Sequence, residues 1–307
     1  MSRRRKPITL AATAATVVLA TVVASSAFAG FAADPRIDDV QLGKKHGVAY
    51  VKDSETVVDS GSTLAPTGCP GKGDAWRVAG GGFSSSKPFN FINMSRPLDH
   101  VDADSAADDY WEVESYSSAV GTKITGYAVC MKAPKLKYAS EIAPNEATSE
   151  RSLSVACPGK TQPISGGASI SHSDSFLSSL SASGNSLTAA VRDATGGTGN
   201  FAADAVCLKT RRIETVRASR IVDPVTQGRV KVLCEAPAMP MGMLYQLHRP
   251  DLNPIPVFES RPIDGRDGDK IPDDGWRVGF NNTSAQPQKV TVTSNCLPPV
   301  AIPKAGP

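Results

Sequence analysis

Aspartates are the residues of this 307-residue chain best suited to chemistry, because a set of five occurs twice at one fixed offset. Each set leads into a tryptophan, Trp111 or Trp276, and the offset is 165 residues. Closely spaced carboxylates, together with backbone carbonyls and water, can supply the roughly six to eight oxygens that Ca²⁺ takes. The candidate calcium ligands are Asp99, Asp102, Asp104, Asp108, Asp109, Asp264, Asp267, Asp269, Asp273 and Asp274.

Two other interpretations of the aspartates remain open. Neither set has the spacing of an EF-hand loop, which needs flanking helices and a terminal glutamate. The aspartates can instead form a solvated hairpin tip, where their side chains bond to local backbone amides and keep an exposed edge soluble. They can also recognise a partner directly. Because unbalanced carboxylates repel one another, calcium is the one cofactor that the sequence suggests.

The aspartate sets belong to a longer repeat that is marked by cysteines. Six cysteines permit about fifteen pairings, but the opening Cys69-Pro70-Gly71-Lys72 recurs as Cys157-Pro158-Gly159-Lys160, and Cys234 lies 165 residues after Cys69. The repeat therefore predicts the disulfides Cys69–Cys130, Cys157–Cys207 and Cys234–Cys296. On the chain-entropy model each stabilises its repeat by about 4 kcal/mol. A zinc site is the weaker alternative, since no close cysteine pair or histidine cluster is present.

Short runs of alternating apolar and polar residues, separated by Gly, Pro, Asn and Asp, predict an all-β fold. We place three tandem β repeats at 46–132, 136–209 and 214–297, and they form either separate β-sandwich units or one pseudo-threefold, prism-like body. The glycine clusters of the first two repeats, Gly80 to Gly82 and Gly166-Gly167, suit a bulge, a bend or a close approach to a neighbouring strand. Phosphate binding is the alternative for these glycines.

The second repeat lacks the aspartate loop. From the first cysteine to the tryptophan position the spacing is 42 residues in repeats one and three but 30 in repeat two, where Leu187 replaces the tryptophan. Ser183-Gly184-Asn185-Ser186 stands in place of the loop and predicts a tight hairpin turn. We therefore expect the aspartate loops to be insertions at hairpin tips, and Trp111, Leu187 and Trp276 to be core residues. An exposed, sugar-stacking aromatic is the alternative.

The N-terminal end of the chain indicates export. Residues 1–29 have a cationic start, an apolar stretch and a small-residue cleavage site, as in a signal peptide; an uncleaved membrane anchor is the alternative. A linker over 30–45 precedes the repeats, and a Pro-rich tail covers 298–307. Residues 1–29 hold four of the 33 Lys and Arg and no acidic residue, so 29 remain against 30 Asp and Glu. This balance gives no indication of nucleic-acid binding.

The chain resembles a group of uncharacterised secreted actinobacterial proteins with β repeats. Their pattern is a Cys-Pro-x-Gly opening, a Gly-Gly-Gly element, a Pro-Asp-Asp-Gly-Trp loop and a Tyr-Ala-Val-Cys closing. The matching residues here are Cys69-Pro70, Gly80 to Gly82, Pro272 to Trp276 and Tyr127 to Cys130. Repeat three departs from this pattern, with Met243-Leu244-Tyr245 where the glycines align and a Pro-rich stretch, Pro237 to Pro262, expected as an irregular edge. The resemblance implies secretion and β structure.

No catalytic arrangement stands out. The four histidines, His46, His100, His172 and His248, fall in dissimilar contexts, and the triad residue types of Ser171-His172-Ser173-Asp174 are neighbours that point apart in a strand. We expect a secreted or cell-surface-associated, non-catalytic protein that binds a surface glycan or protein, with no membrane span once the signal is removed. A purely structural extracellular module and a polysaccharide-active enzyme are the alternatives.

Overall fold

The computed structural model describes residues 40–45, 47–57, 61–70, 76–99, 106–117, 120–132, 136–145, 150–171, 175–193, 199–210, 212–248, 256–265, 267 and 269–299. The chain divides into two units, residues 1–34 and 35–307, and every described residue belongs to the second. The predicted signal peptide, the linker up to residue 39 and residues 300–307 of the tail lie outside the described residues.

The described residues form nineteen antiparallel β-strands and no α-helix, so the predicted all-β class is confirmed. The strands of repeat one are β2 (Val48–Thr56), β3 (Gly61–Gly68), β4 (Trp76–Ser85), β5 (Phe91–Leu98), β6 (Tyr110–Ser117) and β7 (Lys123–Lys132). Those of repeat two are β8 (Lys137–Asn145), β9 (Glu150–Ala156), β10 (Gln162–Ile170), β11 (Ser175–Ser183), β12 (Ser186–Asp193) and β13 (Gly199–Leu208). Those of repeat three are β14 (Glu214–Val222), β15 (Thr226–Leu233), β16 (Met239–His248), β17 (Val257–Ile263), β18 (Gly275–Asn282) and β19 (Gln288–Leu297). One further strand, β1 (Val40–Lys45), lies in the segment expected as linker.

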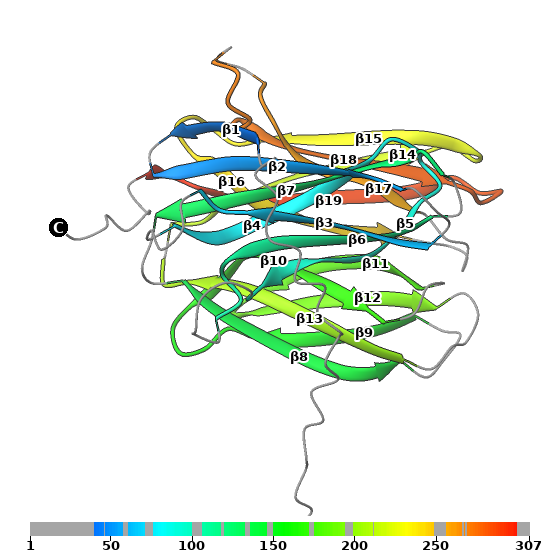
Figure 1. The fold of residues 1–307 in the computed structure, drawn as a ribbon, viewed down its shortest axis with the longest axis horizontal. Helices are drawn as coiled ribbons and strands as arrows, with labels where there is room; N and C mark the ends of the chain where they lie inside the picture. Colours follow the sequence, from blue (N-terminus) through cyan, green and yellow to red (C-terminus); the bar gives the residue numbers. More distant parts are fainter. Residues whose placement is uncertain are drawn as a thin grey trace, which may run out of the picture. The chain divides into compact units, whose positions relative to one another are not determined.

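Three sheets contain these strands, and each sheet combines two repeats (Figure 1). The first has the order β1-β2-β7-β4-β17-β18-β15, the second β3-β6-β5-β10-β13-β8, and the third β14-β19-β16-β11-β12-β9. Each repeat therefore gives three strands to one sheet and three to another.

This exchange of strands is cyclic. Repeat one pairs with repeat three in the first sheet, repeat two with repeat one in the second, and repeat three with repeat two in the third. The joints are equivalent: β4 meets β17, β10 meets β5, and β16 meets β11. A repeat cannot complete either of its sheets alone. Of the two predicted arrangements, the pseudo-threefold body is the one formed.

The glycine clusters lie at these joints. Each of β4, β10 and β16 has a register shift opposite its closing cysteine, as the glycines of the first two repeats predict for β4 and β10. A Cβ on Gly82 would lie 1.9 Å from the carbonyl oxygen of Ser260, and one on Gly167 would lie 1.9 Å from that of Ser95. The glycines therefore allow strands of different repeats to approach closely. The neighbouring strand fills the space that a bound phosphate would need.

The Pro-rich part of repeat three differs from expectation. Instead of an irregular edge, it supplies β16, which lies between β19 and β11, and β17, which lies between β4 and β18. Pro240 sits at the register shift of β16, where its missing N–H disrupts no regular pair. Pairing with β19 also places Gly242, Met243 and Leu244 at the positions of Gly80, Gly81 and Gly82, so the expected alignment of Met243-Leu244-Tyr245 with the glycines is displaced by one residue.

Because the repeats exchange strands, they also share one hydrophobic core. Inward-facing Val, Ile, Phe and Ala side chains of all three repeats form one large cluster of buried apolar residues. Within the part of the chain that the structure describes, no helix has the length and apolar character needed to span a membrane.

Candidate functional site

Three disulfides join the cysteine pairs predicted from the repeat: Cys69–Cys130, Cys157–Cys207 and Cys234–Cys296. The described cysteines include no free thiol. Each first cysteine also marks the end of a hairpin, because its N–H donates to a carbonyl two residues before the tryptophan position. The acceptors are Asp109, Asn185 and Asp274, at 3.3, 2.8 and 2.9 Å. The three hairpins are therefore anchored in the same way.

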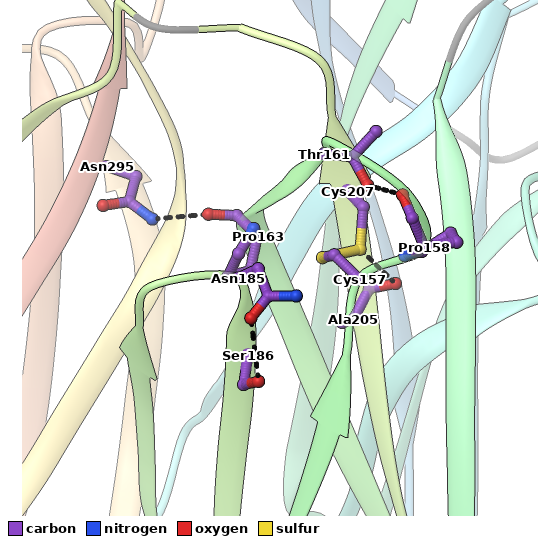
Figure 2. The surroundings of a disulfide bond; sticks show 9 residues. All are labelled: Cys157, Pro158, Thr161, Pro163, Asn185, Ser186, Ala205, Cys207 and Asn295. Carbon is purple, nitrogen blue, oxygen red and sulfur yellow. Dashed lines mark hydrogen bonds between the residues drawn. A yellow bond between two sulfur atoms is a disulfide. The ribbon is translucent and has the colours of Figure 1, made fainter.

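Repeat two closes this hairpin with two residues. Ser183 pairs with Ser186 across Gly184 and Asn185, and Gly184 has a positive φ of 60°, which confirms the predicted tight turn. Figure 2 shows Asn185 and Ser186 beside the Cys157–Cys207 disulfide. The aspartate loops of repeats one and three occupy the place of this turn, since they connect the equivalent strands β5 to β6 and β17 to β18.

The three residues at the tryptophan position are buried in the core. Trp111 and Trp276 are 1% and 0% exposed, and Leu187 is 0% exposed. The indole of Trp111 packs over Gly81, and Leu187 packs over Gly166 at the corresponding position of repeat two. These side chains have no surface on which a sugar could stack.

The aspartate loop of repeat three surrounds an ammonium group of the protein itself. Lys45 Nζ lies 2.6 Å from Asp267 Oδ2, 3.0 Å from Asp269 Oδ2 and 3.1 Å from Asp273 Oδ2. Lys45 is the last residue of β1, which pairs with β2 and continues the first sheet beyond the repeat. The first strand therefore supplies the counter-ion for a loop more than two hundred residues later in the chain.

These contacts change the pKa values of Lys45, Asp267 and Asp273. Hydrogen bonds to Asp267 and Asp269 raise the pKa of Lys45 well above its ordinary value. The hydrogen bond from Lys45 lowers the pKa of Asp267. Burial raises the pKa of Asp273, an effect that Lys45 partly offsets and that the charges of Asp269 and Asp267 increase. Asp273 is the buried member of the group, and Lys45 offsets part of the cost of its buried charge.

Other aspartates of this loop act as turn-forming acceptors. Asp274 Oδ2 accepts from the N–H groups of Gly265 and Asp267, at 2.8 and 3.4 Å. Asp269 Oδ1 accepts from the N–H of Ile271 at 2.8 Å. These bonds match the solvated hairpin tip, one of the interpretations left open by the sequence.

The same loop also brings carboxylates close enough to share a cation. Oxygens of Asp264, Asp267 and Asp274 lie within 4.8 Å of one another, as do oxygens of Asp267, Asp269 and Asp273. Hard cations such as Ca²⁺ accept this type of ligand. In the second group a divalent ion would have to displace the Lys45 ammonium. Calcium binding thus stays a prediction, and the Lys45 ammonium is the group that would compete with the ion.

In repeat one the buried aspartate has a different counter-ion. Asp108, the counterpart of Asp273, is buried and forms an ion pair with Arg77 of β4. The pairing with the closing strands puts Met239 at the place of Arg77 in repeat three, which therefore lacks this guanidinium. Asp99 follows β5 and Asp109 precedes β6, whereas Asp102 and Asp104 lie outside the described residues. Of the histidines, His46, His100 and His172 also lie outside them.

A second charged cluster was not predicted. Glu259 of β17 is only 4% exposed and accepts hydrogen bonds from three guanidiniums, those of Arg229, Arg261 and Arg277. Burial raises the pKa of Glu259, but the three arginines together lower it below its ordinary value. Sequence reasoning missed this cluster because it searched for residues that recur, and of the four only Arg261 does, as Arg96. At the offset of 165, Met94 corresponds to Glu259 and Glu112 to Arg277.

Comparison with known proteins gives one short match. Residues 221–249, which run from the end of β14 through β15 and β16, match a protein family described as RebB, killing trait. No curated protein matches the chain. The matched segment covers less than half of repeat three, so it does not assign the chain to that family.

Proposed function

We propose that this chain is a secreted, non-catalytic protein that binds a polymer of a cell surface through the outer faces of its sheets. One observation carries the proposal: the three repeats share strands, joints and disulfides, yet differ in the residues at equivalent outward positions. In repeat two these positions include the exposed Ser152 and Ser154, and in repeat three the exposed Arg229 and Lys231. A fixed core with variable faces is suited to binding rather than to catalysis.

Three further features support secretion. The disulfides are of the kind found in exported proteins, residues 1–29 read as a signal peptide, and the sequence resembles secreted actinobacterial β-repeat proteins. The short match to a family described as a killing trait is compatible with a role outside the cell but indicates no ligand.

A glycan array with the chain from residue 30 onward tests the proposal. Binding to any surface glycan is the expected result. Loss of this binding in EDTA would indicate that the aspartate loops take part in glycan binding. Absence of binding to every glycan and to whole cells contradicts the proposal and favours a purely structural module. Hydrolysis of a cell-wall polymer by the purified protein contradicts the non-catalytic assignment.

A further inference from the structure

The arginine cluster of repeat three carries more positive charge than its own carboxylate neutralises. Arg229 Nε donates to Glu259 Oε2 at 2.9 Å, and Arg261 Nε donates to Glu259 Oε1 at 2.7 Å. Arg277 donates to Oε1 through both Nε and Nη2. Three of these four bonds end on Oε1 and one on Oε2. One negative charge therefore faces three guanidiniums, each with donors left over.

Neighbouring residues extend this positive face. Arg229, Arg261 and Arg277 have side chains that are 54%, 29% and 31% exposed. Lys231 is exposed and pairs with Arg277 across β15 and β18, while Arg277 pairs with Arg261 across β18 and β17. Directly paired residues of a sheet point to the same side. Lys231, Arg277 and Arg261 thus form a row across three adjacent strands.

The guanidiniums of this face are held in place before any ligand arrives. Arg229 lies over the ring of Phe258, with its Cζ 5.3 Å from the centroid, and Arg261 lies 6.0 Å from the ring of Tyr127. Glu259 fixes one edge of each group. Because these contacts already restrict the side chains, less conformational entropy is lost when they bind a further anion.

The fold itself does not require these charges. Pairing of β9, β11 and β12 places small hydroxyl residues of repeat two at the equivalent positions. The residues equivalent to Arg229, Lys231, Glu259, Arg261 and Arg277 are Ser152, Ser154, Ser179, Ser181 and Thr188. The equivalent strands of repeat two therefore form a sheet with no ionic group at these five positions, although Glu150 and Arg192 pair further along the same face. Repeat one has Met94 at the place of Glu259 and Glu112 at that of Arg277, so it lacks this cluster as well.

We propose that this face of β15, β18 and β17 docks a polysaccharide that carries carboxylates, such as a polyuronate. The inference rests on the proposed function and names its ligand class. Glu259 shows that the guanidiniums here are oriented for a carboxylate, a group whose geometry their planar forks match. Adjacent strands lie about 4.8 Å apart, close to the length of one pyranose residue in a linear chain. Successive uronates could thus meet Lys231, Arg277 and Arg261 in turn.

The test replaces the charged residues of this face in repeat three with the residues at the equivalent positions of repeat two. The variant R229S/K231S/E259S/R261S/R277T replaces each charged residue with its counterpart, and it includes Glu259 so that no buried carboxylate is left unpaired. Its net charge falls by three, and K132S/K137S/K209S, which removes three exposed lysines elsewhere, is the matched control. Binding to immobilised polygalacturonate is measured for the chain from residue 30, with dextran as the neutral reference.

We expect wild type and control to bind polygalacturonate, and the five-residue variant to bind at least about tenfold more weakly. Added salt should weaken wild-type binding, because the contacts are partly exposed. K231S, which breaks no contact with Glu259, should retain the fold and weaken binding by about threefold. Equal binding by all variants, or a preference for polyphosphate over polygalacturonate, overturns the proposal. If wild type binds a neutral glycan but not polygalacturonate, this inference fails and the proposed function stands.

Discussion

The indole N–H of Trp111 donates to the hydroxyl of Ser95 across 2.9 Å, and Trp276 makes the same bond to Ser260 across 3.1 Å. In repeat two both partners have changed together: Leu187 replaces the tryptophan, and pairing in the sheets places Leu180 at the serine position. A buried donor left without an acceptor is costly. The two positions therefore act as a unit.

A double-mutant cycle tests this coupling. S95A should destabilise the protein by about 1–3 kcal/mol, because the Trp111 N–H loses its buried acceptor. The double variant S95L/W111L should lose less stability than the sum of S95L and W111L, by about 1 kcal/mol or more. Urea unfolding measures the four values. If the stability losses of S95L and W111L simply add up in the double variant, the leucine pair does not take the place of the hydrogen bond.

The close approach at the joints gives a second prediction. G82A should destabilise the protein by about 2–4 kcal/mol, because the new Cβ would meet the Ser260 carbonyl, which belongs to another repeat. G184A is the contrasting variant: no atom lies within 4 Å of its Cβ, and only the positive φ of the turn is strained. It should lose about 1 kcal/mol. Equal losses in thermal unfolding would contradict the role assigned to Gly82.

These joints also show what the sequence could not predict. The disulfides follow from motifs that recur, and the Gly184-Asn185 turn from the local sequence that replaces the aspartate loop; both were predicted. Pairing of β4 with β17 joins segments far apart in the chain, and no local motif encodes it. Lys45 lies outside every repeat, so the offset gave no reason to connect it with Asp273. Comparing the repeats for differences of charge would have found Glu259 and Arg277.

The ionisation of Glu259 predicts how stability depends on pH. Since its folded pKa is lowered, the cluster contributes stability above the ordinary glutamate pKa of about 4.3 and loses it as pH falls through the folded value. E259Q should therefore be less stable than wild type at neutral pH, by about 1–3 kcal/mol after allowance for the partly exposed arginines.

Thermal unfolding at a series of pH values measures this difference. The gap between wild type and E259Q should narrow as the pH falls below the ordinary glutamate pKa of about 4.3, because the unfolded chain then takes up a proton that the folded protein resists. E141Q removes an exposed glutamate of β8 and is the control, with a nearly constant gap of at most about 0.5 kcal/mol. A gap for E259Q that is independent of pH would contradict the assignment.

Lys45 provides the sharpest test of calcium binding by the loop of repeat three. K45M removes the ammonium from Asp267, Asp269 and Asp273, so the three carboxylates repel one another. Without calcium the variant should be less stable by about 1–2 kcal/mol, since Asp273 is buried while Lys45 is partly exposed. Calcium should restore this stability, and calorimetry should show at least about tenfold tighter binding than in wild type.

K44M is the matched control, because it removes the same charge one residue away. Lys44 Nζ lies over the ring of Trp76, 5.3 Å from the centroid, rather than in the loop. K44M should therefore bind calcium as wild type does. Equal affinity in K45M and wild type would show that the ammonium does not compete. If none of the three proteins binds at millimolar calcium, the carboxylates do not form a calcium site, and Lys45 together with the backbone amides is sufficient to balance them.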